Sequence, residues 1–166
     1  MNVRVGLGFD VHPFGGDGPL VLGGVTIEGP GLVGHSDADV VAHAVADALL
    51  GAAGLPDLGA QFPATDESLG GISSLELLRR VVTQVAAQGW GLGNVDVVIA
   101  AEQPRLAPHM AAMEANLAAA LALLAGDAAV TVKAKRGEGV GTVGRGEAIA
   151  AWAVALLVRM PGGRGE

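Results

Sequence analysis

Bulky apolar residues alternate with small or polar residues from residue 3 to residue 28, and a glycine pair, Gly23 and Gly24, interrupts this run. Alternation with a period of two is typical of β-strands, so the segment is predicted to be a β-region of short strand segments. From Ser36 the period changes, because apolar residues now recur at steps of three and four. This change predicts an amphipathic helix that ends near Gly54.

The rest of the chain shows further helical and strand patterns. They predict, in order, a helix over 74–88, a strand over 95–100, a helix over 108–124 and a strand over 129–134. Residues 55–72 are rich in glycine, proline and acidic residues and are predicted to be a loop that lies over a site. Residues 147–159 fit either a helix, because of their alanines, or an antiparallel strand that returns to the sheet.

Composition narrows the classes of protein to which the chain can belong. A length of 166 residues supports one domain, placed here at 1–159 and followed by a flexible tail at 160–166. Aromatic residues make up only 3% of the chain and the net charge is −7, so nucleic-acid binding is not expected. No stretch of membrane-spanning length lacks glycine and charge, so we expect a cytoplasmic protein without membrane contact.

Because the chain has no cysteine, any metal site must use histidine and carboxylate ligands. Asp10 and His12 are two residues apart on a predicted strand, so their side chains project to the same face. His43 lies on the predicted helix, where Asp39 and Asp47, four residues to either side, are expected to orient its imidazole. An Asp-His-His set leaves one zinc position open for a substrate oxygen. On spacing alone, surface polar residues without a metal are an equal alternative.

The segment H-S-D-A-D gathers a second histidine and two carboxylates at the start of the same helix. Ser36 stands three residues before Asp39, a spacing that resembles a capping box, so Ser36 is predicted to cap the helix. The backbone amides of a capped helix end also attract anions, which suggests that a phosphate binds there. A cap without a ligand is the simpler alternative.

A second group of charges lies in the glycine-rich stretch 137–146 and just before it. Cations beside exposed backbone amides suit a phosphate pocket, and Glu138 in the same stretch could bring Mg²⁺ to phosphate oxygens. A solvated turn is the alternative. The cations are Lys133, Lys135, Arg136 and Arg145.

Several motifs occur in a fixed order from about residue 3 to residue 159: G-F-D-V-H, L-G-G-V, H-S-D-A-D-V-x-x-H-A-x-x-D-A-L-L-G-A, L-G-N-V-D-V, P-R-L, V-K-A-K and G-R-G-E. Taken together, they resemble the 2-C-methyl-D-erythritol 2,4-cyclodiphosphate synthases of the non-mevalonate isoprenoid pathway. The resemblance implies an α/β (α+β) single domain whose mixed, mostly antiparallel sheet is covered by helices on one face. It also implies a homotrimer with active sites between subunits.

The same resemblance implies the reaction and its site residues. A cytidine diphosphate-linked methylerythritol 2-phosphate would be converted to a cyclic diphosphate and CMP by attack of the 2-phosphate on the β-phosphorus. Zn²⁺, one per subunit, would bind Asp10, His12 and His43, and Mg²⁺ or Mn²⁺ at Glu138 would bridge the diphosphate. His35 and Arg136 would take part in catalysis, and His35 and Ser36 would also contact phosphate, as would Asp10 and His12.

The remaining substrate-binding residues that the resemblance implies fall into three groups. They are Asp57, Leu58, Gly59, Phe62 and Asp66 around the methylerythritol; Ala101, Pro104, Arg105, Leu106, Ala107, Ala134, Lys135 and Arg136 around the cytidine and its phosphate; and Thr142 and Arg145 near a central channel that can take an isoprenoid diphosphate.

Three residues depart from the family's usual pattern. Arg136 stands where threonine is usual, Ala64 where an acidic residue is common, and Thr142 where an aromatic residue is common. Two other functions use the same ligands. A zinc-dependent phosphohydrolase would deliver water to phosphorus and give an uncyclised monophosphate. A non-catalytic trimeric protein that binds a metal or an isoprenoid diphosphate is the third hypothesis.

Overall fold

A five-stranded sheet forms the centre of the computed structural model, which describes residues 2–126 and 128–161. The strand order is β2-β1-β5-β3-β4; only β3 and β4 run parallel, and the other neighbours are antiparallel. This confirms the predicted mixed, mostly antiparallel sheet. The strands are β1 Val3–Leu22, β2 Val25–Leu32, β3 Trp90–Ala100, β4 Ala129–Lys135 and β5 Ala148–Arg159.

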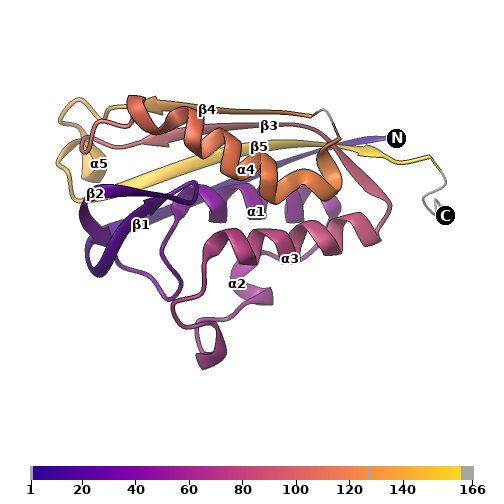
Figure 1. Cartoon of the computed structure of the whole chain (residues 1–166), viewed down its shortest axis with the longest axis horizontal. Coiled ribbons are helices and arrows are strands. Elements are labelled where there is room, and N and C mark those ends of the chain that lie inside the picture. Colours follow the sequence, from indigo (N-terminus) through magenta and orange to yellow (C-terminus); the bar gives the residue numbers. More distant parts are fainter. Residues whose placement is uncertain (1, 127, 162–166) are drawn as a thin grey trace.

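Three long helices lie on one face of this sheet (Figure 1). Helix α1 packs on β1 and β5, α4 packs on β3 and β4, and α3 packs against α1 and α4. Helix α4 with the turn before it, 107–125, is long and apolar enough to span a membrane by composition, but its apolar residues Met113, Leu117 and Leu121 are buried in this core. The helices are α1 Val40–Ala53, α2 Leu58–Gln61, α3 Ser74–Ala87, α4 Met110–Ala125 and α5 Gly141–Gly144, with 3₁₀ turns at Glu67–Leu69 and Ala107–His109.

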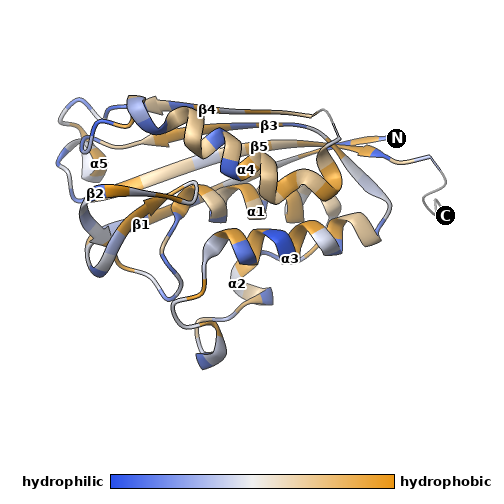
Figure 2. Cartoon of the chain, in the orientation of Figure 1, coloured by the Kyte–Doolittle hydropathy of each residue, from blue (hydrophilic) through white to orange (hydrophobic). Residues whose placement is uncertain are grey.

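Helix α1 lies unusually close to β1 because two glycines of the strand face it. A Cβ atom built on Gly6 would come within 1.9 Å of the carbonyl oxygen of Ala48, and one on Gly8 within 1.9 Å of that of Ala44. Figure 2 shows that α1 is apolar along most of its length, whereas α3 carries polar residues. The glycines therefore set α1 almost in contact with the strand that carries Asp10 and His12.

The opposite face of the sheet is apolar and uncovered in the isolated chain. Val5 is 67% exposed and Leu7 is 68% exposed, although both are bulky and apolar. The rings of Phe9 and Trp152 lie 5.1 Å apart on the neighbouring strands β1 and β5. We call the residues Val3, Val5, Leu7, Phe9, Val11, Trp152 and Val154 the open face. A contiguous apolar patch of this kind marks an interaction surface.

The structure resolves one alternative that the sequence left open and differs from the sequence-based predictions in two features. The ambiguous segment 147–159 forms strand β5, the central strand of the sheet, and the loop 55–72 contains two short helical segments. Ser36 does not cap α1; Asp39 does, because it directly precedes Val40 and accepts hydrogen bonds from the N–H groups of Val41 and Ala42. At the C-terminus, Met160 donates its N–H to Gly89, and the remainder of the predicted tail, 162–166, lies outside the described residues.

Candidate functional site

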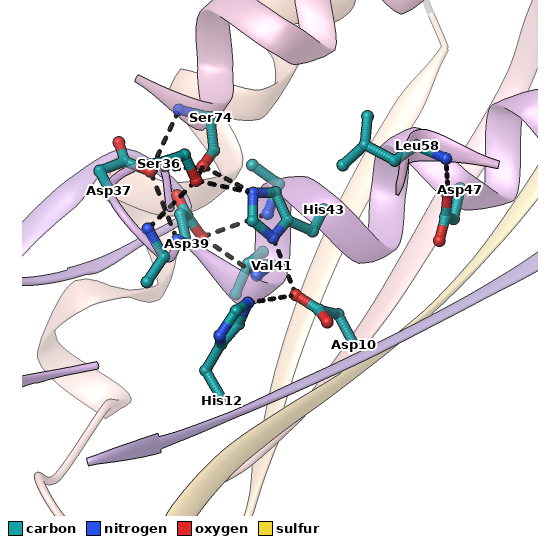
Figure 3. A network of polar contacts seen from close by, with 12 residues as sticks. Asp10, His12, Ser36, Asp37, Asp39, Val41, His43, Asp47, Leu58 and Ser74 are labelled. Carbon is teal, nitrogen blue, oxygen red and sulfur yellow. Dashed lines mark hydrogen bonds and ion pairs between the residues drawn. The ribbon is translucent and has the colours of Figure 1, made fainter. Parts of the chain in front are cut away.

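Asp10, His12 and His43 form a compact cluster between β1 and α1 (Figure 3). Asp10 and His12 point to the helix side of β1, as their two-residue spacing predicts, and His43 faces them from α1. Oδ2 of Asp10 lies 3.1 Å from Nε2 of His12 and 2.9 Å from Nδ1 of His43. One donor atom from each side chain lies within 4.8 Å of the others, so a single metal ion could contact all three.

The outward ring nitrogens of both histidines are hydrogen-bonded, so the inward nitrogens, which face Asp10, are the ones that a metal ion would bind in place of a hydrogen. Nδ1 of His12 lies 2.5 Å from the carbonyl oxygen of Val33. Because a carbonyl only accepts, Nδ1 carries a hydrogen, and Nε2 is the nitrogen whose lone pair is available to a metal. In His43 the roles are reversed, since Nε2 lies 2.9 Å from the hydroxyl of Ser74 and 3.1 Å from that of Ser36.

Ser74 is itself fixed by Asp37. Its hydroxyl and its N–H both contact Oδ1 of Asp37, and Ser74 is 1% exposed. Because the hydroxyl hydrogen is donated to the carboxylate, the Ser74 oxygen accepts from Nε2 of His43. The chain of contacts from Asp37 through Ser74 to His43 therefore presents the Nδ1 lone pair to the cluster (Figure 3).

The predicted orientation of His43 by Asp39 and Asp47 is wrong. Asp39 is fully buried and accepts hydrogen bonds from Gly23 and Gly24 as well as from the start of α1. Asp47 accepts a hydrogen bond of 2.7 Å from the N–H of Leu58, the first residue of α2. The two carboxylates thus hold the β1–β2 turn and the covering loop, because nearer unpaired amides compete for them.

Charge within the cluster favours an ionised carboxylate. Burial raises the pKa of Asp10, but hydrogen bonds from His12 and His43 and their charges outweigh it, so the pKa lies well below its usual range. The hydrogen bond to Asp10 raises the pKa of His12 above its ordinary value, against an opposing effect of burial. One carboxylate and two imidazoles, whose outward ring nitrogens are already hydrogen-bonded, are a donor set typical of a catalytic zinc site. The residues present fit a metal ion of this kind.

A cavity of about 300 Å³ opens beside the cluster. It brings together eight of the residues predicted for the metal, the phosphates and the methylerythritol. Asp57 caps α2 at its rim, and the carbonyl oxygen of Asp66 lies 3.1 Å from Nε2 of His35. The cavity is lined by Asp10, His12, His35, Ser36, His43, Asp47, Leu58, Gly59, Phe62, Ala64, Leu69, Ile72 and Leu77.

A second cavity, of about 400 Å³, lies between the end of β3 and the end of β4. All the residues predicted to surround the cytidine and its phosphate line it. Glu102 also lines this cavity, and its carboxylate contacts Arg136 and the N–H groups of Gly137 and Glu138. The cavity is lined by Ala101, Glu102, Gln103, Pro104, Arg105, Leu106, Ala107, Ala134, Lys135 and Arg136.

Besides Asp57 and Asp66, three predicted residues line neither of these two cavities in the part of the chain that the structure describes. Glu138 is exposed at a backbone φ of 50° beside Glu102. Thr142 lies in α5, and Nε of Arg145 contacts Glu147 at 2.7 Å. Within a single chain, the predicted magnesium ligand is therefore not among the residues that line the cavity beside Asp10, His12 and His43.

Among the residues that sequence reasoning missed, Ser74 and Glu102 contact the predicted site residues His43 and Arg136 directly. Ser74 begins α3, 31 positions after His43, and nothing in its local pattern distinguishes it from a helix start. Glu102 lies in the segment that the resemblance associates with cytidine. The one signal that could have identified it is its charge, since a carboxylate is unexpected in a segment that approaches phosphate.

Comparison with known proteins covers nearly the whole chain. The YgbB family model matches residues 3–158. The chain is 56% identical over 162 residues to 2-C-methyl-D-erythritol 2,4-cyclodiphosphate synthase of Bordetella bronchiseptica, an alignment that covers 96% of this chain and 99% of the relative. It is also 57% identical over 158 residues to the bifunctional enzyme IspD/IspF of Anaeromyxobacter sp. strain Fw109-5, covering 95% of this chain. The chain spans about 40% of the length of such bifunctional relatives.

Solved structures agree with these sequence matches. The bifunctional IspDF of Campylobacter jejuni has a TM-score of 0.88 at 39% identity, and the match covers 95% of this chain and 42% of that one. The CDP complex of IspF from Plasmodium falciparum has a TM-score of 0.82 at 29% identity, with 96% and 98% covered. A family model over residues 3–158 and relatives more than half identical over nearly the full length lead to one conclusion: the chain belongs to the YgbB family.

Proposed function

We propose that the chain is a 2-C-methyl-D-erythritol 2,4-cyclodiphosphate synthase of the non-mevalonate isoprenoid pathway. It converts 4-diphosphocytidyl-2-C-methyl-D-erythritol 2-phosphate to the cyclic diphosphate and releases CMP. An oxygen of the 2-phosphate forms a bond to the β-phosphorus, while the bond from that phosphorus to the oxygen bridging to the α-phosphate breaks. The electron pair leaves with CMP, so the reaction needs no water and no redox partner.

The observation that supports this proposal most strongly is the Asp10, His12 and His43 cluster in a chain 56% identical, over 99% of its length, to a synthase of this name. The cluster opens directly into a cavity that could hold a small phosphorylated polyol. Because the ligand atoms come from rigid elements whose positions are fixed by buried contacts, the site is organised before substrate arrives.

Zinc is the metal that we assign to this cluster, with Asp10 Oδ2, His12 Nε2 and His43 Nδ1 as its ligands. When bound, Zn²⁺ would neutralise phosphate charge and make phosphorus more electrophilic. The protein's own contribution is orientation. Val33 and Ser74 fix the two imidazoles, and the segment with Leu58 and Phe62 lines the cavity, where it would shield a bound substrate from water and favour attack by phosphate over hydrolysis.

The second cavity is proposed to hold the cytidine and its phosphate, with Arg105 and Lys135 as nearby cations. Glu138 would supply a carboxylate for Mg²⁺ or Mn²⁺ bridging the diphosphate, since such ions commonly use one carboxylate and several phosphate oxygens. Because Glu138 does not line the first cavity of its own chain, we propose that the magnesium site is completed by a neighbouring subunit.

The assembly that we propose is a homotrimer in the cytoplasm. The open face would be buried against two further copies, because its bulky apolar residues would otherwise stay in water. Thr142 and Arg145 would then border a central channel that can take an isoprenoid diphosphate. Sedimentation of the purified chain should give the mass of three copies, and a monomer at micromolar concentration would contradict this part of the proposal.

The function is tested by incubating the purified chain with 4-diphosphocytidyl-2-C-methyl-D-erythritol 2-phosphate, Zn²⁺ and Mg²⁺. Stoichiometric release of CMP, measured by chromatography, is the expected result. A chain that binds metal and substrate but releases no CMP would be a binding protein and would refute the synthase activity.

A further inference from the structure

The carboxylate of Glu102 is saturated with donors at the rim of the second cavity. Nε of Arg136 donates to Oε1 at 3.1 Å, and a terminal nitrogen of the same guanidinium contacts that oxygen as well. The N–H groups of Gly137 and Glu138 each donate to Oε2 at 3.1 Å. An ionised carboxylate offers about four acceptor positions, so Glu102 has none left for a ligand.

This arrangement turns Glu102 inward while Arg136 stays accessible. The Glu102 side chain is 17% exposed, whereas the Arg136 side chain is 62% exposed. The hydrogen bond from Arg136, together with its charge and the two N–H groups, lowers the pKa of Glu102, so the carboxylate is charged when it makes these contacts. One edge of the guanidinium is held, and its remaining N–H groups are available to an anion.

Glu102 also fixes the backbone that follows. Glu138 has a φ of 50°, a left-handed conformation that costs energy in a residue with a side chain. The hydrogen bond from its N–H to Glu102 helps to hold that conformation. Two consecutive N–H groups converging on one oxygen form an anion-binding turn, and here a side chain of the protein itself fills it.

We propose that Glu102 is a positioning residue for the phosphate of a cytidine nucleotide: by its contacts with Arg136 and with the backbone of 137–138, it holds the guanidinium so that the remaining N–H groups of Arg136 bind this phosphate at the second cavity. The inference rests on the proposed function for the identity of the nucleotide. It also changes the interpretation of Arg136. The arginine does not replace a threonine by itself, but acts as one unit with Glu102.

The test compares two ligands that differ only in phosphate. Binding of CDP and of cytidine to the full chain is measured by calorimetry for the wild type and for Glu102→Gln, which keeps the side-chain shape but loses the charge. We expect Glu102→Gln to weaken CDP binding about tenfold, because charge-assisted hydrogen bonds are lost, and to leave cytidine binding within about twofold. Glu76→Gln, which removes a carboxylate that pairs with Arg79 and Arg80 on α3, is the matched control and should change neither.

A second variant tests whether the two residues act together. Arg136→Gln alone should weaken CDP binding to a similar extent, and the double variant should be no weaker than either single variant, because the same arrangement is already lost. Unchanged or tighter CDP binding by Glu102→Gln would overturn the inference, since Glu102 would then compete with phosphate. A parallel loss of CDP and cytidine binding would also overturn it by showing a general structural role.

The failure of this inference is distinguishable from failure of the proposed function. If the wild type releases CMP but Glu102→Gln binds CDP normally, the function stands and the role of Glu102 is wrong. If the wild type releases no CMP but the CDP and cytidine contrast is observed, Glu102 positions a nucleotide phosphate in a protein with another activity.

Discussion

The two cavities are built in opposite ways. At the proposed zinc site, His43 is held by a partner inside the fold, since Ser74 is 1% exposed, and His12 is held by a backbone carbonyl, that of Val33. At the second cavity, the central ion pair joins Glu102 to an arginine that is 62% exposed. The first site is therefore fixed by the same buried contacts that stabilise the fold. The second is fixed by a local pair in contact with water, so its geometry can change without affecting the core.

This difference predicts which properties of the protein a substitution at each cavity should change. A substitution among the buried supports of the zinc cluster should alter both stability and metal affinity, because the supporting groups lose partners inside the protein. A substitution at the Glu102 pair should alter ligand binding alone, because exposed ion pairs add little to stability.

The largest effect is expected for His43→Ala. It removes one of three ligands, so stoichiometric zinc and CMP release should both disappear. Metal content is measured by mass spectrometry after dialysis. His109→Ala, in the 3₁₀ turn before α4, is the control and should retain one zinc per chain. Zinc retained by His43→Ala would show that the assigned ligands are wrong.

Asp39→Ala tests how much the carboxylate that caps α1, the helix that carries His43, contributes to the stability of the fold. The change leaves four N–H donors without their carboxylate, the buried ones of Gly23, Val41 and Ala42 and the half-buried one of Gly24. The free energy of unfolding, measured with urea, should fall by about 3 kcal/mol, the cost of unpaired buried donors and a lost cap. Glu28→Ala, at an exposed position of β2, should change it little. Equal stability of the two variants would contradict a structural role for Asp39.

Ser74→Ala removes the acceptor for Nε2 of His43 without touching a metal ligand. Zinc affinity, measured by chelator competition, should fall about tenfold, which is typical when the hydrogen-bond partner of a metal-binding histidine is lost. Ser36→Ala should have a smaller effect, because the Ser36 hydroxyl is farther from Nε2 and is not fixed by Asp37. If Ser36→Ala weakened zinc binding more than Ser74→Ala, the assigned chain of contacts would be wrong.

The smallest effect on zinc affinity is expected for a substitution at the second cavity. Glu102→Gln should leave zinc affinity unchanged within about twofold, since its contacts are with residues 136–138 and it does not line the cavity of the zinc cluster. The zinc affinity of this variant is measured by the same chelator competition. A loss similar to that of Ser74→Ala would show that the two cavities are one coupled unit.

Local patterns predicted most of the fold and a candidate set of metal ligands, for which spacing alone left surface polar residues as an equal alternative. The two-residue spacing of Asp10 and His12 placed both on one side of β1, and the apolar period after Val40 predicted α1. The pattern of 147–159 remained ambiguous because alanines face α1 from a strand as readily as they form a helix. The pairing of β5 with β1 and β3 depends on residues far away in the sequence.

The supports of the site could not be predicted for the same reason. Asp39 and Asp47 lie on the expected side of α1, but tertiary contacts with Gly23, Gly24 and Leu58 decide where their carboxylates point. Ser74 reaches His43 only because α3 begins beside α1. Sequence spacing identifies ligands that share an element, whereas their orienting partners come from other elements.

The identity of the phosphorus product tests the central claim most directly. The wild-type chain with Zn²⁺, Mg²⁺ and 4-diphosphocytidyl-2-C-methyl-D-erythritol 2-phosphate is followed by phosphorus NMR until the substrate is consumed. We predict two coupled resonances of a cyclic diphosphate together with that of CMP. Resonances of uncyclised phosphate monoesters in their place would show that water attacks phosphorus, and would identify the chain as a hydrolase instead of a cyclodiphosphate synthase.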